Sequence, residues 1–272
     1  MSDTILPVSE IQPNIDEDKQ HIISMFENNV KHREIHTEGY HNDHCGKEGH
    51  WLESKMGITP NAKNAPDLRG FECKKTSKKT TLGDYSASEY LFSKKKDNIN
   101  QYNGWSNEII MSRNEYITTF GNPNPKKNNR YSWSGSCVPT YDTYNSNGTV
   151  LTVSATNDLI VYYSFSKDTR NNKHNFPEYL QHDNIVIAIW LADKLRTHIN
   201  NKFNQRGFFI CTKENNVYEK ICFGKPFNFD YFIECIKNKT IIFDSGMYQG
   251  NSRNYSMFRG ASFWKDLIIE EY

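Results

Sequence analysis

A continuous apolar run in the second half of the chain sets the strongest limit on what it can fold into. Residues 184–190 read Asn-Ile-Val-Ile-Ala-Ile-Trp, an uncharged run of the length and composition of a fully buried strand. It leads directly into residues 191–203, where apolar side chains recur at helical spacing. A buried strand that runs into a helix of about a dozen residues indicates a layered sheet protein.

Strand and helix patterns interleave along the rest of the chain. Helices are expected over 14–33, 51–56, 112–121 and 229–236, the second closed by Gly57 and the third opened by a capping box of Ser112 and Glu115. Strands are expected over 68–73, 108–111, 131–133, 150–153, 159–165, 208–212, 217–223 and 240–243, with a hairpin around Asn215-Asn216. Residues 76–104 are expected to be loop with a weak hairpin, and residues 122–129 loop. The order predicts a mixed α/β protein.

Length and composition exclude several classes of protein. The 272 residues suit one large domain or two small lobes, and 16 Tyr, 16 Phe and 5 Trp exclude a disordered chain. No apolar run approaches the roughly 20 residues that cross a bilayer, so no membrane partner is expected. The first residues lack the pattern of a signal peptide. Six scattered cysteines without a C-x-x-C pair indicate reduced thiols and a cytoplasmic location.

Positive charge is concentrated in a few stretches, although the formal net charge is only +1. Basic side chains crowd residues 74–79, 94–96 and 126–130, whereas residues 1–18 carry acids and no base. An anionic partner responds to local potential rather than to total charge, so these stretches favour a nucleic-acid partner. Taken one at a time, such lysine runs are more often solvated loops.

The residues that point to chemistry lie in one short segment. Residues 66–75 read Pro-Asp-Leu-Arg-Gly-Phe-Glu-Cys-Lys-Lys. On a strand, Glu72 and Lys74 share one face and Cys73 points away, and a bend at Gly70 brings Asp67 near the same face. Two carboxylates form a hard, oxygen-rich site that suits Mg²⁺, and a neighbouring lysine positions a metal-bound water or stabilises charge on a phosphate. These are the parts needed to hydrolyse a phosphodiester.

The spacing Pro-Asp-x4-Glu-x-Lys resembles the signature of the PD-(D/E)xK nucleases. Glu53 stands on an upstream helix, fourteen residues before Asp67. From Leu52 to Lys74 the chain is similar to the pattern LE…LGI…N…PD…G-hydrophobic-E-x-K of the MutH-like branch, which includes the MvaI/BcnI-type restriction endonucleases. Residues 120–135 and 244–264 also resemble the MvaI type. Cys73 departs from the usual apolar residue, and the first 35 or so residues match nothing in the pattern.

The resemblance implies a restriction-endonuclease-like core, a second DNA-recognition lobe and a DNA cleft between them. Residues 1–135 would form mainly the catalytic lobe, with its core motif at 49–75, and residues 136–272 mainly the recognition lobe, with a boundary open to interleaving. The family consists of monomers that bind double-stranded DNA, cut its strands in succession with one active site, and read short sites of the CC-x-GG kind. A cognate DNA methyltransferase would be the genetic partner.

Roles are carried over to the matching positions only. Asp67 and Glu72 would hold Mg²⁺, Lys74 would orient the water, and Glu53 would support the catalytic site. Guanine readout asks for Arg or Lys donors in the major groove, while phosphate contacts add affinity without sequence information. Arg253 and Arg259 are the expected base-reading residues, with Asn254 and Tyr255 as helpers. Lys126, Lys127 and Arg130 would hold phosphates, and Lys75 completes the expected DNA-binding set.

Other interpretations stay open at this point. His36, His41, His44, Cys45 and His50 invite a zinc site, but their spacing lacks the usual pairs of ligands, which favours histidines in a loop near an anion. A partner-dependent nicking enzyme of the MutH kind would use the same motif. A DNA-binding module without catalysis would keep the carboxylates for structural reasons. Retention of all four catalytic residues argues against such a module.

Overall fold

The structure, a computed structural model, describes residues 15–36, 46–59, 64–105, 111–260 and 262–272. Helices in these ranges are α1 (Ile15–Asn29), α2 (Lys47–Lys55), α3 (Asp97–Asn103), α4 (Arg113–Phe120), α5 (Ala192–Phe203) and α6 (Phe229–Lys237). Strands are β1 (Glu72–Lys75), β2 (Thr80–Asp84), β3 (Glu89–Tyr90), β4 (Asn122–Asn124), β5 (Arg130–Trp133), β6 (Asn147–Val153), β7 (Leu159–Asp168), β8 (Ile185–Trp190), β9 (Phe208–Glu214), β10 (Val217–Gly224), β11 (Ile242–Ser245), β12 (Met247–Tyr248), β13 (Ser256–Gly260) and β14 (Ile268–Glu271).

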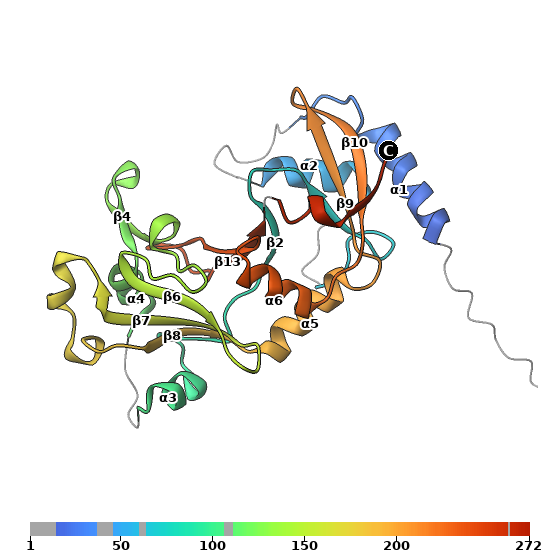
Figure 1. The fold of residues 1–272 in the computed structure, drawn as a ribbon. Coiled ribbons are helices and arrows are strands. Elements are labelled where there is room, and N and C mark those ends of the chain that lie inside the picture. The colour runs from blue at the N-terminus through green and yellow to red at the C-terminus, as the bar shows by residue number, and fades with distance from the viewer. Residues whose placement is uncertain (1–14, 37–45, 60–63, 106–110, 261) are drawn as a thin grey trace, which may run out of the picture.

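A four-stranded sheet in the order β1-β9-β10-β14 carries the strand of the predicted catalytic motif (Figure 1). β1 runs parallel to β9, and β14 adds an antiparallel edge next to β10. β9 and β10 form the expected hairpin, in which Asn215 and Asn216 have φ angles of 51° and 66°. Positive φ at both central residues is what a two-residue hairpin turn requires, so the turn follows from the sequence.

Buried side chains cover both faces of this sheet. Phe209 belongs to a core cluster with side chains of α1 and α2, whereas its neighbour Phe208 belongs to the larger cluster that includes α5. Cys73 of β1 lies on the side of α1 and α2. Because side chains alternate along a strand, Glu72 and Lys74 face the side of α5. Glu72 and Lys74 therefore share one face of β1 and Cys73 lies on the other, as the sequence predicts.

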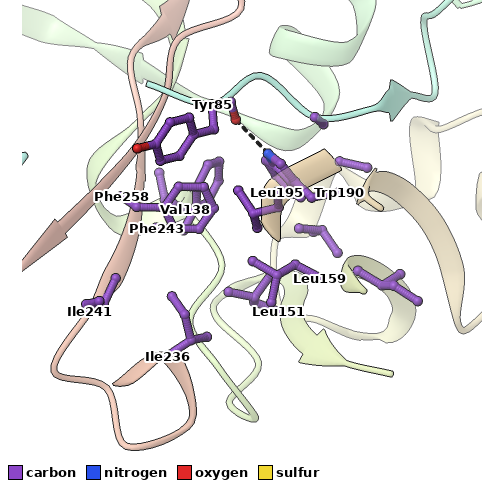
Figure 2. Packing of buried hydrophobic residues seen from close by; sticks show 14 of the residues in the cluster. Tyr85, Val138, Leu151, Leu159, Trp190, Leu195, Ile236, Ile241, Phe243 and Phe258 are labelled. Carbon is purple, nitrogen blue, oxygen red and sulfur yellow. Dashed lines mark hydrogen bonds between the residues drawn. The ribbon is translucent and has the colours of Figure 1, made fainter. Parts of the chain in front are cut away.

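A second sheet, in the order β3-β8-β7-β6, is built around the predicted buried strand. All six residues of β8 are buried, and α5 follows it directly. At the end of β8, Trp190 Nε1 donates a hydrogen bond to the carbonyl oxygen of Tyr85 at 2.7 Å (Figure 2). Phe243 and Phe258 lie beside Trp190, with ring centroids 5.0 and 6.0 Å from it. This aromatic cluster joins the second sheet to β11 and β13.

Two smaller sheets, β11-β13-β2 and β12-β5-β4, complete the fold. The pairs β1–β9, β2–β13 and β5–β12 each join a strand before residue 135 to a strand after it. In Figure 1 the elements around α2 and β10 lie on one side, those around β7 and β8 on the other, and β2, β13 and α6 between them. Strand pairing therefore interleaves residues 1–135 with residues 136–272.

The prediction for residues 76–104 was wrong. β2 and β3 are not a hairpin, because β2 pairs with β13 and β3 with β8. Residues 97–103 form α3, a polar helix with Ile99 as its buried residue. Glu89 accepts hydrogen bonds from the backbone N–H groups of Asn98 and Ile99 at 3.1 and 3.2 Å. The helix start is thus capped by a side chain of another element, which no local pattern reveals.

Other elements are confirmed, with shifts at their ends that are common for such boundaries. The strand expected from residue 68 begins only at Glu72, and the expected loop 122–129 begins with β4, which pairs with β5. The segment 244–264 contains β12 and β13.

Some expectations fall partly on residues outside the described ranges. These include most of the strand at 108–111, and His41, His44 and Cys45 of the zinc hypothesis. Within the described ranges, no three or more His, Cys, Asp or Glu residues are placed to hold a metal ion together. The five cysteines described there are buried and free. No helix of the described residues has the length and apolar character to cross a membrane.

The N-terminus of α4 has the predicted capping box. Glu115 N donates to Ser112 Oγ at 3.2 Å, and Ser112 N donates to the Glu115 carboxylate at 2.6 Å. We expect Ser112→Ala to lower the free energy of unfolding by about 1 kcal/mol, because one helix N–H loses its acceptor. Urea unfolding measures the change. Asn114→Ala, an exposed change within the same helix, is the control and is expected to alter stability by less.

Candidate active site

A tight turn returns Asp67 to the start of β1. The turn has Arg69 and Gly70 at its tip, with φ angles of 51° and 83°, and the residues on either side exchange backbone hydrogen bonds of 3.0 and 2.8 Å. Asp67 Oδ2 accepts a hydrogen bond from the backbone N–H of Cys73 at 2.9 Å. The bend that the sequence predicts at Gly70 is therefore present, and it places the first carboxylate of the motif beside the strand that bears the second.

Glu72 is buried beneath two lysines. Its side chain is 1% exposed, and Oε1 accepts from Lys74 Nζ at 2.5 Å and lies 3.0 Å from Lys202 Nζ. Lys202 comes from α5, on the side of the sheet that Glu72 faces. The sequence analysis missed Lys202, because it is remote from the motif along the chain. Its one signal was a position next to Phe203, at the edge of the buried stripe of that helix.

Lys74 carries its proton in this arrangement. Burial by itself would lower the pKa of Lys74, but the carboxylates of Glu72 and Asp67 outweigh burial and raise that pKa. Opposite charges a few ångströms away favour the charged form of an amine. Lys74 is thus a hydrogen-bond donor at neutral pH. The three motif residues meet at one place, as the sequence predicts.

Lys74 also lines a pocket of about 540 Å³. Glu53 reaches the same pocket from α2, and Tyr255 and Arg259 reach it from the C-terminal segment. His50, one turn before Glu53, lies 3.4 Å from the Glu53 carboxylate. The pocket therefore brings the predicted catalytic lysine and supporting glutamate together with three of the predicted DNA-binding residues, Lys75, Tyr255 and Arg259.

Helix α2 is fixed to the sheet through Glu48. The Glu48 carboxylate lies 2.5 Å from Lys213 Nζ, accepts from the Tyr218 hydroxyl at 2.8 Å, and accepts from Lys75 Nζ at 3.1 Å. Burial alone would raise the pKa of Glu48, but these three hydrogen bonds lower it. Lys75, a predicted DNA contact, is thus paired within the protein while it lines the pocket.

The predicted base-reading arginines are both held by carboxylates. Arg253 Nη2 lies 2.8 Å from Asp84, and its guanidinium stacks 4.8 Å from the ring centroid of Tyr255. Arg259 Nη1 lies 3.2 Å from Asp244. Paired in this way, a guanidinium keeps a defined plane and can still offer its remaining N–H groups.

Arg113 at the start of α4 holds the loop that carries Arg253 and Asn254. It donates to Asn254 Oδ1 at 2.7 Å, to the Asn251 carbonyl and side-chain oxygens at 2.5 and 2.8 Å, and to the Arg253 carbonyl oxygen at 2.8 Å. Asn254 is thereby oriented with its acceptor occupied. The sequence analysis missed Arg113, because no local pattern indicates that it contacts a loop so far away in the chain.

The remaining predicted contacts lie on the β4–β5 turn. Lys126 and Lys127 are exposed there, and the Arg130 guanidinium lies 3.6 Å from the ring centroid of Tyr248. None of these basic residues lines the pocket that contains Lys74. The exposure of Lys126 and Lys127 suits phosphate contacts outside the pocket, whereas Arg130 is half-buried.

The carboxylates of Asp67 and Glu72 suit a hard divalent cation. Glu72 Oε2 is buried and has no hydrogen-bond partner, and a buried carboxylate oxygen is normally satisfied. A cation at this oxygen would satisfy it. Because Mg²⁺ is commonly bound through one or two carboxylates with waters and phosphate oxygens, two such residues are sufficient.

Comparison with known proteins identifies the family. The model of the LlaMI restriction endonuclease family matches residues 31–272. This chain belongs to the LlaMI restriction endonuclease family. The chain is also 40% identical over 269 residues to the type II restriction enzyme ScrFI of Lactococcus lactis subsp. cremoris. The match covers 93% of this chain and 97% of ScrFI.

A solved structure supports the fold of this LlaMI-family protein. This chain is similar in structure to restriction endonuclease MvaI in its complex with cognate DNA substrate. The TM-score is 0.56, and the sequences are 14% identical, over 94% of this chain and 96% of the MvaI chain. At this identity the likeness concerns the fold alone. It confirms the expected mixed α/β, restriction-endonuclease-like fold and the resemblance to the MvaI type.

Proposed function

We propose that this protein hydrolyses phosphodiester bonds of double-stranded DNA at a short C/G-rich site of the CC-x-GG kind, with Mg²⁺ as its metal. The observation that carries the proposal is the meeting of Asp67, Glu72 and Lys74 beside a pocket that Arg259 also lines. It supplies both a hydrolytic centre and a donor for guanine at one surface of a restriction endonuclease family member.

Each side chain has a defined task in the proposed reaction. Asp67 and Glu72 would hold the metal, whose chemistry when bound is to polarise a phosphate oxygen and acidify a water. Lys74, protonated, donates a hydrogen bond to the attacking water or the phosphate and stabilises the negative charge that grows there. The water oxygen forms a bond to phosphorus while one phosphorus–oxygen bond of the backbone breaks. The water gives up one proton to solvent, and the leaving oxygen takes up one proton from solvent. Glu53 supports the site from α2.

Recognition is assigned to the C-terminal segment and the basic turn. Arg253 and Arg259 would donate to guanine O6 and N7, helped by Asn254 and Tyr255. Lys75, with the basic residues of the β4–β5 turn, Lys126, Lys127 and Arg130, would contact phosphates. In this proposal the protein acts as a monomer whose one active site cuts the strands in succession, and a cognate methyltransferase protects the host DNA. The part of the protein that contains β1 would form the catalytic side of the DNA-binding surface, and the part that contains β13 would form the recognition side.

Digestion of unmethylated phage DNA by the purified protein tests the proposal. We expect discrete fragments with Mg²⁺ and none with EDTA, because the two carboxylates cannot replace the metal. Sequencing the fragment ends gives the site and the overhang. Tight, salt-sensitive binding without cleavage would instead favour a partner-dependent nicking enzyme or a binding module. Cleavage that persists in EDTA would remove the metal from the proposal.

A further inference from the structure

Helix α1 lies before the part of the chain that the family model covers, residues 31–272, yet it contacts the turn that carries Asp67. Ile22, Ile23 and Phe26 of α1 are buried in the core cluster on the Cys73 side of the sheet. Asp18, on the same helix, is 8% exposed, which is unusual for a carboxylate. Its position requires partners, and they come from two other segments.

Both partners of Asp18 are arginines. Arg69 Nη1 donates to Asp18 Oδ1 at 2.6 Å, and Arg206 Nη1 donates to Asp18 Oδ2. Hydrogen bonds from Arg69 and Arg206 hold the pKa of Asp18 below its usual value, so it is ionised at neutral pH. Charge-assisted hydrogen bonds of this kind are stronger than neutral ones and fix the geometry of a guanidinium.

The two arginines connect Asp18 to both residues at the tip of the turn, Arg69 and Gly70. Arg69 is one of the two central residues of the turn and has a φ angle of 51°. A residue other than glycine keeps such an angle only when its surroundings hold it there. Arg206 lies against the other, since a Cβ atom added to Gly70 would come within 2.9 Å of Arg206 Cδ. Arg206 Nη1 also donates to the Arg69 carbonyl oxygen at 3.4 Å.

We propose that Asp18 is a positioning residue for the active site: with Arg206 it fixes the turn at Arg69 and Gly70, and thereby the carboxylate of Asp67. The turn is the covalent link between Asp67 and Glu72, so a shift at its tip changes the separation of the two carboxylates. Misplacement of a reacting group by about 1 Å costs up to about a hundredfold in rate. The inference rests on the proposed function for its effect on cleavage, and on the structure alone for its effect on the turn.

Asp18→Asn is the test, because it keeps the shape and removes the charge. We expect the single-turnover cleavage rate with saturating enzyme and Mg²⁺ to fall by about tenfold to a hundredfold. DNA affinity in EDTA is expected to stay unchanged. In the metal-free protein, hydrogen–deuterium exchange of the Cys73 amide, which donates to Asp67, is expected to become faster.

Lys19→Met is the matched control on the same helix. Lys19 pairs with Glu270 of β14 at 2.5 Å and so ties α1 to the sheet without touching the turn. It is expected to leave both cleavage and Cys73 exchange unchanged. Equal losses in the Asp18 and Lys19 variants would overturn the proposal in favour of a general role of α1 in stability. Wild-type cleavage and exchange in Asp18→Asn would also overturn it.

Arg206→Met gives an independent arm if Asp18→Asn does not fold. It removes the hydrogen bonds that Arg206 donates to Asp18 and to the Arg69 carbonyl oxygen, while Asp18 keeps Arg69, and the same two changes are expected. If the wild-type protein cuts no DNA, the proposed function fails, and Cys73 exchange in the metal-free variants still decides whether Asp18 positions the turn.

Discussion

Lys74→Ala is expected to lower the rate of DNA cleavage by about a hundredfold to ten-thousandfold while DNA binding stays largely intact. The variant removes the only motif residue that donates a proton or hydrogen bond at the site, and groups that do so in a transition state contribute about that factor. Single-turnover cleavage of a duplex that carries the site, with saturating Mg²⁺, measures the rate. Gel-shift or anisotropy titration in EDTA measures binding.

Asp67→Ala and Glu72→Ala are expected to have effects of the same size, because each removes a proposed metal ligand. Glu72→Ala also leaves two half-buried lysines, Lys74 and Lys202, without their carboxylate, so its thermal midpoint has to be compared with that of the wild type. Lys78→Ala is the control for the loss of one positive charge, since Lys78 is exposed and does not line the pocket. A variant of Asp67, Glu72 or Lys74 that cuts at the wild-type rate would remove that residue from the catalytic role.

Arg259→Ala is expected to weaken binding to the target site by about 1–3 kcal/mol, or roughly fivefold to 150-fold, and binding to random duplexes much less. Arg259 lines the same pocket as Lys74 and is oriented by Asp244, so a base edge near the catalytic centre can receive its donors. Competition titrations with target and random duplexes at one salt concentration measure the ratio.

Arg259→Lys separates base readout from phosphate contact. Lysine keeps the charge but loses the planar fork, so discrimination is expected to fall while affinity for random DNA is retained. An equal loss of affinity on target and random DNA in Arg259→Ala would make Arg259 a phosphate contact. A salt dependence reduced by about one ion would support that second assignment.

Local patterns predicted the elements whose geometry depends on neighbouring residues. Alternation along a strand placed Glu72 and Lys74 on one face of β1 and Cys73 on the other. The capping box at Ser112 and the hairpin at Asn215-Asn216 were confirmed because backbone donors and positive φ angles are satisfied within a few residues. The same holds for β8, whose uninterrupted apolar run marks it as buried on both faces.

Long-range partners were outside the reach of such patterns. The helix α3 was missed because Glu89 caps it from another element, and β2 was misassigned because its partner is β13, near the other end of the chain. The lysine of α5 that reaches Glu72, Lys202, was missed for the same reason. Each of these contacts depends on which elements pack together, and the sequence near either partner carries no record of that choice.

The sequence by itself determined the candidate catalytic motif, two carboxylates and a lysine at the start of a strand, and most of the strands and helices around it. Those features depend on side-chain periodicity and backbone sterics over a few residues. Only the tertiary structure decided which distant side chains complete the site. It placed Lys202 on Glu72 and joined Asp18 of α1 to the turn of Asp67, because burial of charged groups is stable only where packing brings their partners within hydrogen-bond distance.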